Sequence, residues 1–323
     1  MNKIMKICFI VAGALVLVGI IMFVVVMSIL GWDFMRLSTV KYESNSYDIT
    51  EAFDNINVKS NTAKFQFLLS EDGKCKIECY EDIKSKHSVA VNDGALEIFV
   101  VNEKKWYDYI NIDINSNLAK ITVYLPEAEY NSLTLNSSTG MVEVSKKLSF
   151  TNVDISVSTG AVRCYANVKE NLNVKTTAGD ITLDNISVGA VDLKASTGRV
   201  NVSNITCDGD FHVKMSTGDM EISNVKCENI TFSGNTSDID LQSVIATQKI
   251  NIDVSTGDVE LEACDAGELF IVTDTGDVEA TLLSPKVFVT KTDTGKVRVP
   301  SSIEGGRCEI VTDTGDIEIR VVK

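Results

Sequence analysis

A three-residue sequence, usually Ser-Thr-Gly or Asp-Thr-Gly, recurs at a fixed interval through the second half of the chain. Its third residue falls at positions 140, 160, 179, 198, 218, 237, 257, 276, 295 and 315, so neighbouring copies are 19 or 20 residues apart. Gly fills that position in every copy but one, where Ser237 replaces it. A fixed period of this length is typical of repeat architectures, in which each unit buries its apolar face only by stacking on its neighbours.

The residues on both sides of each copy repeat as well. Positions −7, −5, +2 and +4, counted from the Gly, are apolar in 39 of 40 cases when Cys and Ala are included, and Thr290 is the exception. Alternation on both sides of a turn indicates two strands per repeat, each with one buried face. The sequence therefore predicts an all-β fold, a single parallel β-solenoid of 19–20-residue rungs preceded by one transmembrane helix.

Two details of the repeat support stacking in register. Gly after Ser-Thr fits a turn residue with positive φ, which is free of strain only without a Cβ. Asn185, Asn204 and Asn224 all lie six positions after the turn Gly. In a stack of equal coils these side chains would form an Asn ladder, which satisfies polar groups between layers.

The N-terminal part of the chain contains 24 consecutive residues without a charge, from Ile7 to Leu30. A helix of that length spans about 36 Å, enough to cross a bilayer. Lys3 and Lys6 precede it, which predicts a cytoplasmic N-terminus and an extracytoplasmic C-terminal domain. A cleaved signal peptide is the alternative, but its apolar part is only about 7–15 residues long and ends in a small-residue site. We therefore expect an uncleaved single-pass anchor in the cell membrane.

The chain is expected to divide into five parts. These are a cytoplasmic N-terminus (1–6), a transmembrane helix (7–30), a juxtamembrane linker (31–50), irregular first coils that cap the solenoid (51–130) and the regular solenoid (131–323). Strand-like runs continue through the irregular part, one of them from Tyr109 to Ile114. The last rung, Ile317 to Val322, has no cap, so its C-terminal edge is expected to be open for self-association.

Composition and charge restrict the partners. Aromatic residues make up 7% of the chain, so the core must be aliphatic, and the formal net charge of −15 argues against nucleic acid as a partner. The eight cysteines are scattered and indicate neither a disulfide framework nor a zinc site. Cys207 and Cys227 would stack in adjacent coils, close enough for a disulfide. Free thiols are the preferred interpretation.

Two acidic patterns could carry chemistry. Three turns read Asp-Thr-Gly, the local signature of aspartic proteases, but Ser or Thr fills the Asp position in other rungs. A turn whose side chain binds local amides is therefore favoured. Acidic residues also follow the turn Gly, and a stacked stripe of them could bind calcium, although a solvated edge is preferred. The stripe consists of Asp180, Asp219, Asp258, Asp277 and Asp316.

Other catalytic patterns are missing from the sequence. His87 and His212 have no recurring Ser or Cys partner, so a Ser-His or Cys-His centre is not predicted. We expect no catalytic, cofactor-binding or metal-binding residue and no cofactor. Trp106, Tyr107 and Tyr109 follow a polar run and are the candidates for contact with a partner. Packing of the irregular cap over the first coil is the alternative for these aromatic residues.

Several segments together resemble one bacterial family. They are the N-terminal anchor, Phe53–Val58, Asn92–Ile98, Ile121–Pro126 and the Ser-Thr-Gly-Asp-Val rungs. Over about residues 50–323 the chain resembles the bacterial "putative adhesin" domain family of unknown function, which includes LiaG-like envelope proteins. The resemblance implies a β-solenoid outside a bacterial membrane and supplies no catalytic residues.

These observations predict a non-enzymatic, membrane-anchored, extracytoplasmic adhesin-like binding or scaffold protein of the bacterial cell surface. Its ligand would be a protein or a glycan, because solenoids offer long, even faces for such contacts. One alternative is an envelope-stress accessory that acts with a membrane sensor. A second alternative, from another class, is a polysaccharide-active β-helix enzyme.

Overall fold

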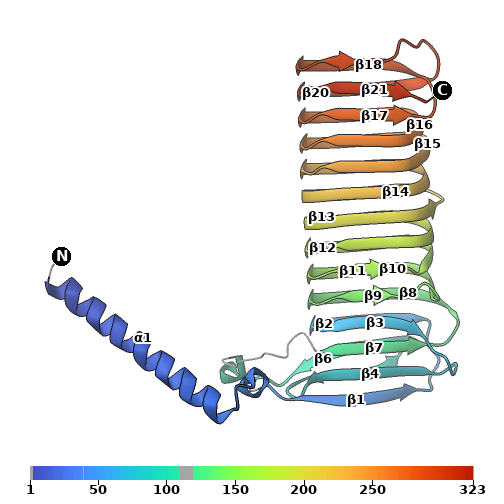
Figure 1. Ribbon diagram of the computed structural model, residues 1–323. Helices are drawn as coiled ribbons and strands as arrows, with labels where there is room; N and C mark the ends of the chain where they lie inside the picture. The colour runs from blue at the N-terminus through green and yellow to red at the C-terminus, as the bar shows by residue number, and fades with distance from the viewer. Residues whose placement is uncertain (1–2, 39, 110–118, 323) are drawn as a thin grey trace.

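The computed structural model describes residues 3–38, 40–109 and 119–322, which form one helix followed by a long stack of strands (Figure 1). Helix α1 spans Lys3–Ile29 and is followed by the short 3-10 helix η1, Phe34–Leu37. The C-terminus lies near the end of the stack that is far from α1 (Figure 1). The predicted β-solenoid with one preceding apolar helix is confirmed.

The strands fall into an irregular first group and a regular second group. The first group is β1 (Tyr42–Ile49), β2 (Asn55–Thr62), β3 (Lys64–Leu69), β4 (Cys75–Asp82), β5 (Ser85–Asn92), β6 (Ala95–Asn102) and β7 (Lys120–Leu125), with the 3-10 helix η2 (Trp106–Tyr109) before β7. The second group begins with β8 (Glu129–Thr139), β9 (Val142–Val144), β10 (Ser149–Thr159), β11 (Val162–Cys164), β12 (Asn167–Ala178), β13 (Ile181–Cys207) and β14 (Asp210–Thr236). It continues with β15 (Ile239–Thr256), β16 (Val259–Thr275), β17 (Val278–Leu282), β18 (Lys286–Thr294), β19 (Val297–Arg298), β20 (Gly306–Thr314) and β21 (Ile317–Val321).

Each regular rung places like residues on like. Val153 of β10 pairs in parallel with Leu133 of the preceding rung and with Leu172 of the following one. The alternating apolar residues of all rungs therefore point into one continuous core, which is almost entirely aliphatic. Branched and aliphatic side chains suit this arrangement because they pack well on a pleated surface.

A close approach between neighbouring rungs requires the turn Gly. The turn glycines have φ between +134° and +158°, a region that residues with a Cβ rarely adopt. A Cβ at Gly160 would lie 1.8 Å from the carbonyl oxygen of Gly140, and the other turn glycines meet a carbonyl oxygen at a similar distance. The recurring Gly is thus fixed by the packing of backbone on backbone.

A second corner of the coil lies six residues after the turn Gly. Asn185, Asn204 and Asn224 adopt the left-handed conformation there, with φ of 56°, 57° and 52°, and Ser243 and Ala263 follow in the next rungs. Asn tolerates this conformation because its short amide forms local hydrogen bonds. One step of the predicted Asn ladder forms, since Asn224 Nδ2 donates to Asn204 Oδ1 at 3.2 Å, whereas Asn204 Nδ2 donates to Asp184 Oδ1 at 2.9 Å in place of Asn185.

The first rungs are not stacked in chain order. The rung of β2 and β3 lies between the rung of β6 and β7 and the rung of β8 and β9. Strands β1, β4 and β5 differ from the other described strands because all their pairings are antiparallel, β1 on β4, β4 on β7 and β5 on β6. They cover the end of the stack nearest α1 (Figure 1). The strand expected at Tyr109–Ile114 lies outside the described residues, except that Tyr109 ends η2.

The last rungs are also out of chain order, which corrects the expected position of the open edge. The rung of β20 and β21 lies between the rung of β16 and β17 and the rung of β18 and β19. Ile317 is therefore fully buried, whereas Val297, at the same position of the preceding rung, is 42% exposed. The segment between β19 and β20 is long enough to lead the chain back by one rung. The outer edge thus belongs to β18 and β19, and the prediction that Ile317–Val322 forms it is wrong.

Candidate functional site

The acidic stripe beside the turns is a hydrogen-bond ladder between rungs. Asp258 Oδ1 accepts the backbone N–H of Asp277 at 2.8 Å, and Asp277 Oδ1 accepts that of Asp316 at 2.7 Å. Asp180 Oδ1 does the same for Arg199 at 2.9 Å. Across the described residues, no three His, Cys, Asp or Glu side chains are grouped so that they could hold a metal ion. The stripe therefore links neighbouring coils through its carboxylates.

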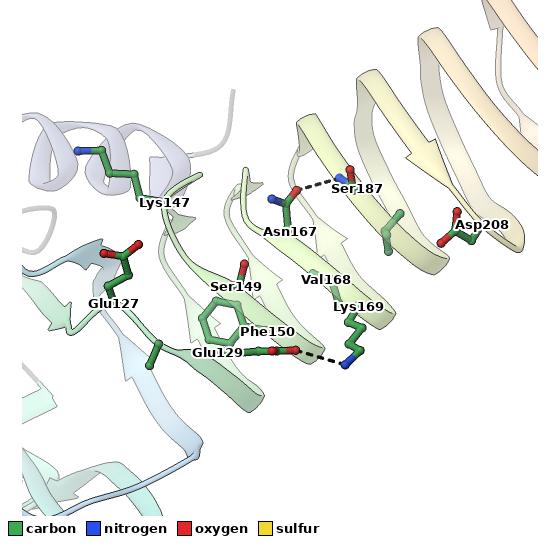
Figure 2. Close-up of a pocket in the computed structure, with 12 residues that line it drawn as sticks. Glu127, Glu129, Lys147, Ser149, Phe150, Asn167, Val168, Lys169, Ser187 and Asp208 are labelled. Carbon is green, nitrogen blue, oxygen red and sulfur yellow. Dashed lines mark hydrogen bonds and ion pairs between the residues drawn. The ribbon is translucent and has the colours of Figure 1, made fainter.

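A groove of about 660 Å³ runs along one side of the first regular rungs (Figure 2). Each coil contributes residues from the same corner, so the lining recurs at intervals of about one rung. The groove is lined by Glu127, Ala128, Glu129, Lys147, Ser149, Phe150, Asn167, Val168, Lys169, Ser187, Val188 and Asp208. Such a surface presents a row of similar binding positions to an extended ligand.

The lining of this groove is polar and carries both signs of charge. Lys169 Nζ lies 3.6 Å from Glu129 Oε1, and more than half of each side chain is exposed. Asn167 Oδ1 accepts the backbone N–H of Ser187 at 2.9 Å (Figure 2). Phe150 is 1% exposed and belongs to the core, so its ring cannot stack on a sugar. The groove can therefore hold a ligand through hydrogen bonds and ion pairs along its length.

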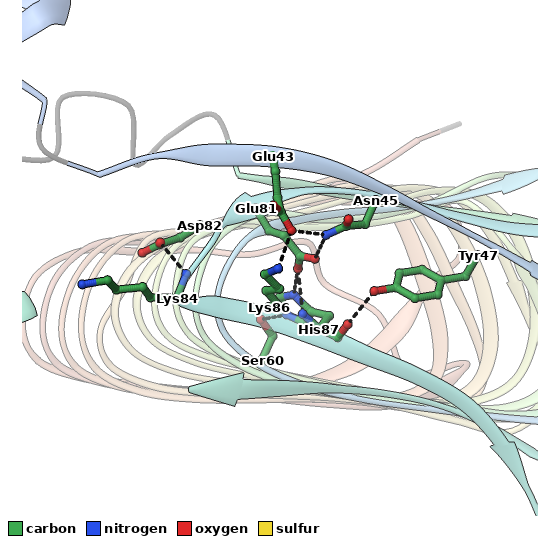
Figure 3. Close-up of polar contacts among 9 residues, drawn as sticks. All are labelled: Glu43, Asn45, Tyr47, Ser60, Glu81, Asp82, Lys84, Lys86 and His87. Carbon is green, nitrogen blue, oxygen red and sulfur yellow. Dashed lines mark hydrogen bonds and ion pairs between the residues drawn. The ribbon is translucent and has the colours of Figure 1, made fainter. Parts of the chain in front are cut away.

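A buried polar network lies under the antiparallel strands of the cap (Figure 3). His87 on β5 places Nδ1 2.7 Å from Glu81 Oε2 on β4 and Nε2 2.9 Å from Ser60 Oγ on β2. Glu81 also accepts the backbone N–H of His87 at 2.7 Å and the amide of Asn45 at 3.0 Å. Tyr47 donates its hydroxyl to the carbonyl oxygen of His87 at 3.2 Å, and burial, helped by the charge of Glu81, raises the pKa of this phenol.

The contact with Glu81 fixes the role of one ring nitrogen of His87. A carboxylate only accepts hydrogen bonds, so Nδ1 donates to Glu81, while Nε2 shares a hydrogen bond with the Ser60 hydroxyl. The resulting order of serine, histidine and carboxylate is that of an acyl-transfer centre. His87 thus has a serine neighbour that the sequence analysis, which searched for a recurring partner, did not predict. Because Ser60 and Glu81 come from different strands and neither spacing recurs, the sequence offered no signal for the contact.

The surroundings of Ser60 favour a structural role for the network. Ser60 is 4% exposed and lies three positions before Ala63. Ala63 occupies the turn position of its rung, because its carbonyl oxygen lies against Gly140 in the same way as the carbonyl oxygen of Gly140 lies against Gly160. Regular rungs also carry a hydroxyl at this core-facing position, for example Thr176, which donates to the carbonyl oxygen of Gly179 at 3.3 Å. Ser60, Glu81 and His87 also line a cavity of about 280 Å³, but each of these three side chains is at most 4% exposed. The network thus satisfies the polar groups of the strands that close this end of the stack.

The cysteines form no bridge, and seven of them are buried and unreactive, whereas Cys8 on α1 is exposed. All eight are free thiols, and Cys207 Sγ lies 3.4 Å from the carbonyl oxygen of Gly189 while Cys227 Sγ lies 4.0 Å from that of Ile245. Burial raises the pKa of the Cys227 thiol to about 12. The reactive thiolate is therefore scarce at neutral pH, and these side chains act as small core residues.

The aromatic candidates lie in η2. Trp106 is 76% exposed and Tyr107 is 49% exposed, and their rings meet edge to face with centroids 5.9 Å apart. Asp108 between them and β7 is buried, pairs with Lys84 and accepts the backbone N–H of Lys105 at 2.9 Å. The side chain of Tyr109 lies outside the described part of the chain. The short helix is thus held by Asp108 with two large rings facing outward.

Helix α1 has the length and composition of a membrane-spanning helix, with 27 residues and no acidic residue in its sequence. A signal sequence near the N-terminus shares these properties. Most of its side chains are apolar and exposed, whereas Met27 near its end is fully buried. The end of α1 therefore packs against the protein that follows it.

Comparison with known proteins identifies a family. Residues 53–210 and 207–323 each match the family model described as Toastrack DUF4097. No curated protein sequence matches the chain. The resemblance to an adhesin-like domain family of unknown function is thereby confirmed.

Solved structures share the fold at low identity. A structure described as a putative lipid binding protein from Parabacteroides distasonis is 18% identical with a TM-score of 0.51, and the alignment covers 88% of this chain and 98% of that one. A putative adhesin from Bacteroides fragilis is 15% identical with a TM-score of 0.45, covering 87% and 97%. A putative adhesin from Parabacteroides merdae is 14% identical with a TM-score of 0.48, covering 88% and 98%.

Proposed function

The chain belongs to the Toastrack DUF4097 family, and from this premise we propose that it is a membrane-anchored, extracytoplasmic binding or scaffold protein of the bacterial cell surface that does not act as an enzyme. The observation that carries the proposal is the short connection from the apolar helix α1 to an uninterrupted solenoid. Only residues 30–41 separate α1 from β1. Descriptions of structural neighbours as adhesins or as a lipid binding protein support a binding role.

The proposed topology follows from the charges around α1. Lys3 and Lys6 precede the uncharged segment 7–30, and basic residues favour the cytoplasmic side. Residues 31–50, of which Tyr42–Ile49 form strand β1 of the cap, then lead from the anchor to the extracytoplasmic part, with the rest of the cap over 51–130 and the regular solenoid over 131–323. In this arrangement β18 and β19 lie at the end of the stack away from the anchor (Figure 1).

The proposed ligand surface is the polar groove along the first regular rungs. It offers carboxylates, amines and amides at intervals of one rung, which suits an extended peptide or glycan. To test this, partners of the full chain are captured from native membranes by cross-linking. The Lys169→Ala variant removes an amine from the groove, and Lys175→Ala on the same strand, β12, is the control. We expect Lys169→Ala alone to reduce capture. Equal capture by both variants would count against the groove, and turnover of glycans by the purified chain would count against a non-enzymatic role.

The same capture experiment distinguishes the two non-enzymatic hypotheses, a binding or scaffold protein and an envelope-stress accessory. A chain whose α1 is replaced by an unrelated membrane helix keeps the groove but loses any contact made within the bilayer. Retained capture supports the binding module. Loss of a membrane sensor from the captured material would instead support the envelope-stress accessory.

Self-association is proposed at β18, since β20 is its one strand partner among the described pairings. Val289 on this strand is 47% exposed, and Val272 on an interior rung, with 43% exposed, is a matched control. A charge on an edge strand hinders pairing with another chain. In analytical ultracentrifugation of the full chain in detergent, Val289→Lys should remove a dimer that Val272→Lys retains. A wild-type chain that stays monomeric at high concentration would exclude this contact.

A further inference from the structure

We propose that Trp106 and Tyr107 insert into the interfacial region of the bilayer that α1 crosses, so that the cap of the solenoid touches the membrane at a second point. The inference rests on the proposed function, because it requires α1 to be a retained anchor. In this proposal the aromatic surface of η2 contacts the headgroups and the upper acyl region of a lipid bilayer.

Hydrogen bonds hold η2 at the end of the stack nearest the anchor. The carbonyl oxygen of Lys41, which directly precedes β1, accepts the N–H of Ile83 at 3.0 Å. The carbonyl oxygen of Lys84 accepts the N–H of Glu103 at 2.9 Å, and the Lys84 amine pairs with Asp108 of η2. Lys41 and Asp108 also line one cavity of about 290 Å³. The position of Trp106 and Tyr107 is therefore tied to the residues that leave the anchor.

The connection from α1 keeps the cap near the membrane. The N–H of Trp32 donates to the carbonyl oxygen of Met27 at 2.8 Å, and the N–H of Arg36 donates to that of Asp33 at 3.2 Å. Residues 30–41 would reach only about 40 Å if fully extended, and these turns shorten them. In Figure 1 both short helices lie at the foot of the stack, where α1 ends. The cap therefore stays within reach of the bilayer surface.

The chemistry of the exposed rings fits the interface. Trp and Tyr gather where hydrocarbon meets headgroups, because their rings are apolar while the indole N–H and the phenol O–H bind water or lipid. Trp106 and Tyr107 are exposed as a pair, and Trp32 and Phe34 beside the helix end are 55% and 51% exposed. The exposed Lys105 next to Trp106 can meet a lipid phosphate. Aromatic side chains thus occur on both segments that lie closest to the membrane.

A protein partner could use the same rings as an anchor. It would have to approach between the cap and the bilayer, where the short connection leaves little space. The lipid interface is already present at this place once α1 is inserted. The geometry therefore favours lipid over a second protein.

The chain has only two tryptophans, Trp32 and Trp106, so the contact can be observed directly. The full-length Trp32→Phe variant is reconstituted in phosphatidylcholine vesicles, and its fluorescence reports on Trp106 alone. We expect a blue-shifted emission maximum, quenching by lipids brominated near the headgroup end of the acyl chain, and protection from acrylamide. The matched control carries Trp32→Phe, Trp106→Phe and Ile303→Trp, because Ile303 is 92% exposed and follows β19 at the far end of the stack. Its tryptophan should be quenched by acrylamide and not by brominated lipid.

The outcomes distinguish this inference from the proposed function. Vesicle flotation in high salt measures the anchor independently of the fluorescence. If the chain floats and Trp106 behaves like the tryptophan at position 303, the second membrane contact is refuted while the anchor stands. If the chain does not float, the proposed function fails and the inference fails with it.

Discussion

Gly160→Ala should destabilise the solenoid through a backbone collision between two rungs. Its Cβ would lie 1.8 Å from the carbonyl oxygen of Gly140, far inside van der Waals contact, so the rungs must separate by more than 1 Å at that point. The nearby bonds from Gly140 N to Thr159 O and from Val142 N to Ala161 O, both 2.9 Å, would be strained or lost. Each is worth about 0.5–1.5 kcal/mol, and the unfavourable φ adds about 1–2 kcal/mol. The total is about 2–5 kcal/mol.

Gly94→Ala is the control that separates strain from collision. Gly94 also has a positive φ, +75°, but a Cβ there would meet nothing within 4 Å. It should therefore lose only the conformational part, about 1 kcal/mol. Urea unfolding of the full chain in detergent, followed by circular dichroism, measures both variants, and hydrogen exchange should show opening centred on the turns at 140 and 160. Equal losses in the two variants would refute the view that the close approach of rungs makes Gly necessary.

Three further predictions concern buried and charged groups. His87→Ala leaves the carboxylate of Glu81 buried without its main partner and should lower the free energy of unfolding in urea by about 3–5 kcal/mol. The control His212→Ala removes a half-exposed ring and should change this free energy by no more than about 0.5 kcal/mol. Similar losses in the two variants would contradict the buried network. Burial raises the pKa of Cys164 to about 11, so at pH 8 iodoacetamide should modify this thiol only after unfolding. Mass spectrometry of native and denatured samples measures the labelling. Rapid labelling of the native protein would show that the core is open. Burial, with the nearby Glu221 and Asp238, raises the pKa of the Asp240 carboxyl, and a raised carboxyl pKa contributes stability at low pH that is lost as pH rises through it. Asp240→Asn should therefore raise the melting temperature near neutral pH and lose this advantage below about pH 3, and an unchanged melting temperature at neutral pH would exclude the repulsion.

The regular rungs were predictable because one physical requirement repeats in each of them. Most residues that face the core are apolar, and the residue at the close turn is Gly in every copy but that of Ser237, so both constraints recur at the rung period. Asn204 and Asn224 were found for the same reason, since their corner adopts the left-handed conformation in successive rungs. Because the backbone has the same requirement in each rung, the same type of residue recurs in the sequence at the rung period.

The order of rungs at the two ends was not predictable from the repeat. Parallel pairing joins like positions, so a rung fits almost any other rung of equal length, and the ladder alone does not choose its neighbours. The choice is made by connections of irregular length, such as the segment between β19 and β20. One signal was nevertheless present. Thr290, the single polar residue among the repeated apolar positions, lies in β18, the rung whose outer side is uncovered.

The buried network of the cap was unpredictable for a different reason. Glu81 and His87 come from β4 and β5, which pair antiparallel, and they meet Ser60 of the parallel strand β2, whereas the repeat implied parallel stacking alone. Their spacing in the chain reflects the lengths of two connections and carries no period. The structure was needed to bring them together, and their burial indicates that the contacts satisfy polar groups of the cap.

The two ends of the stack differ in how their terminal strands are covered, and this difference bears on function. Near α1, antiparallel strands and a buried network close the core, and the exposed side chains there include the large rings of Trp106 and Tyr107 on η2. At the far end the core-facing Val297 is 42% exposed and β18 retains an unpaired edge. Because the interior rungs are nearly interchangeable, a mutation on one interior face should alter binding less than a mutation at either end or in the groove. Specific contacts are therefore expected where the coils stop being equivalent: η2 near α1, the groove at the first regular rungs, and β18 at the distal edge.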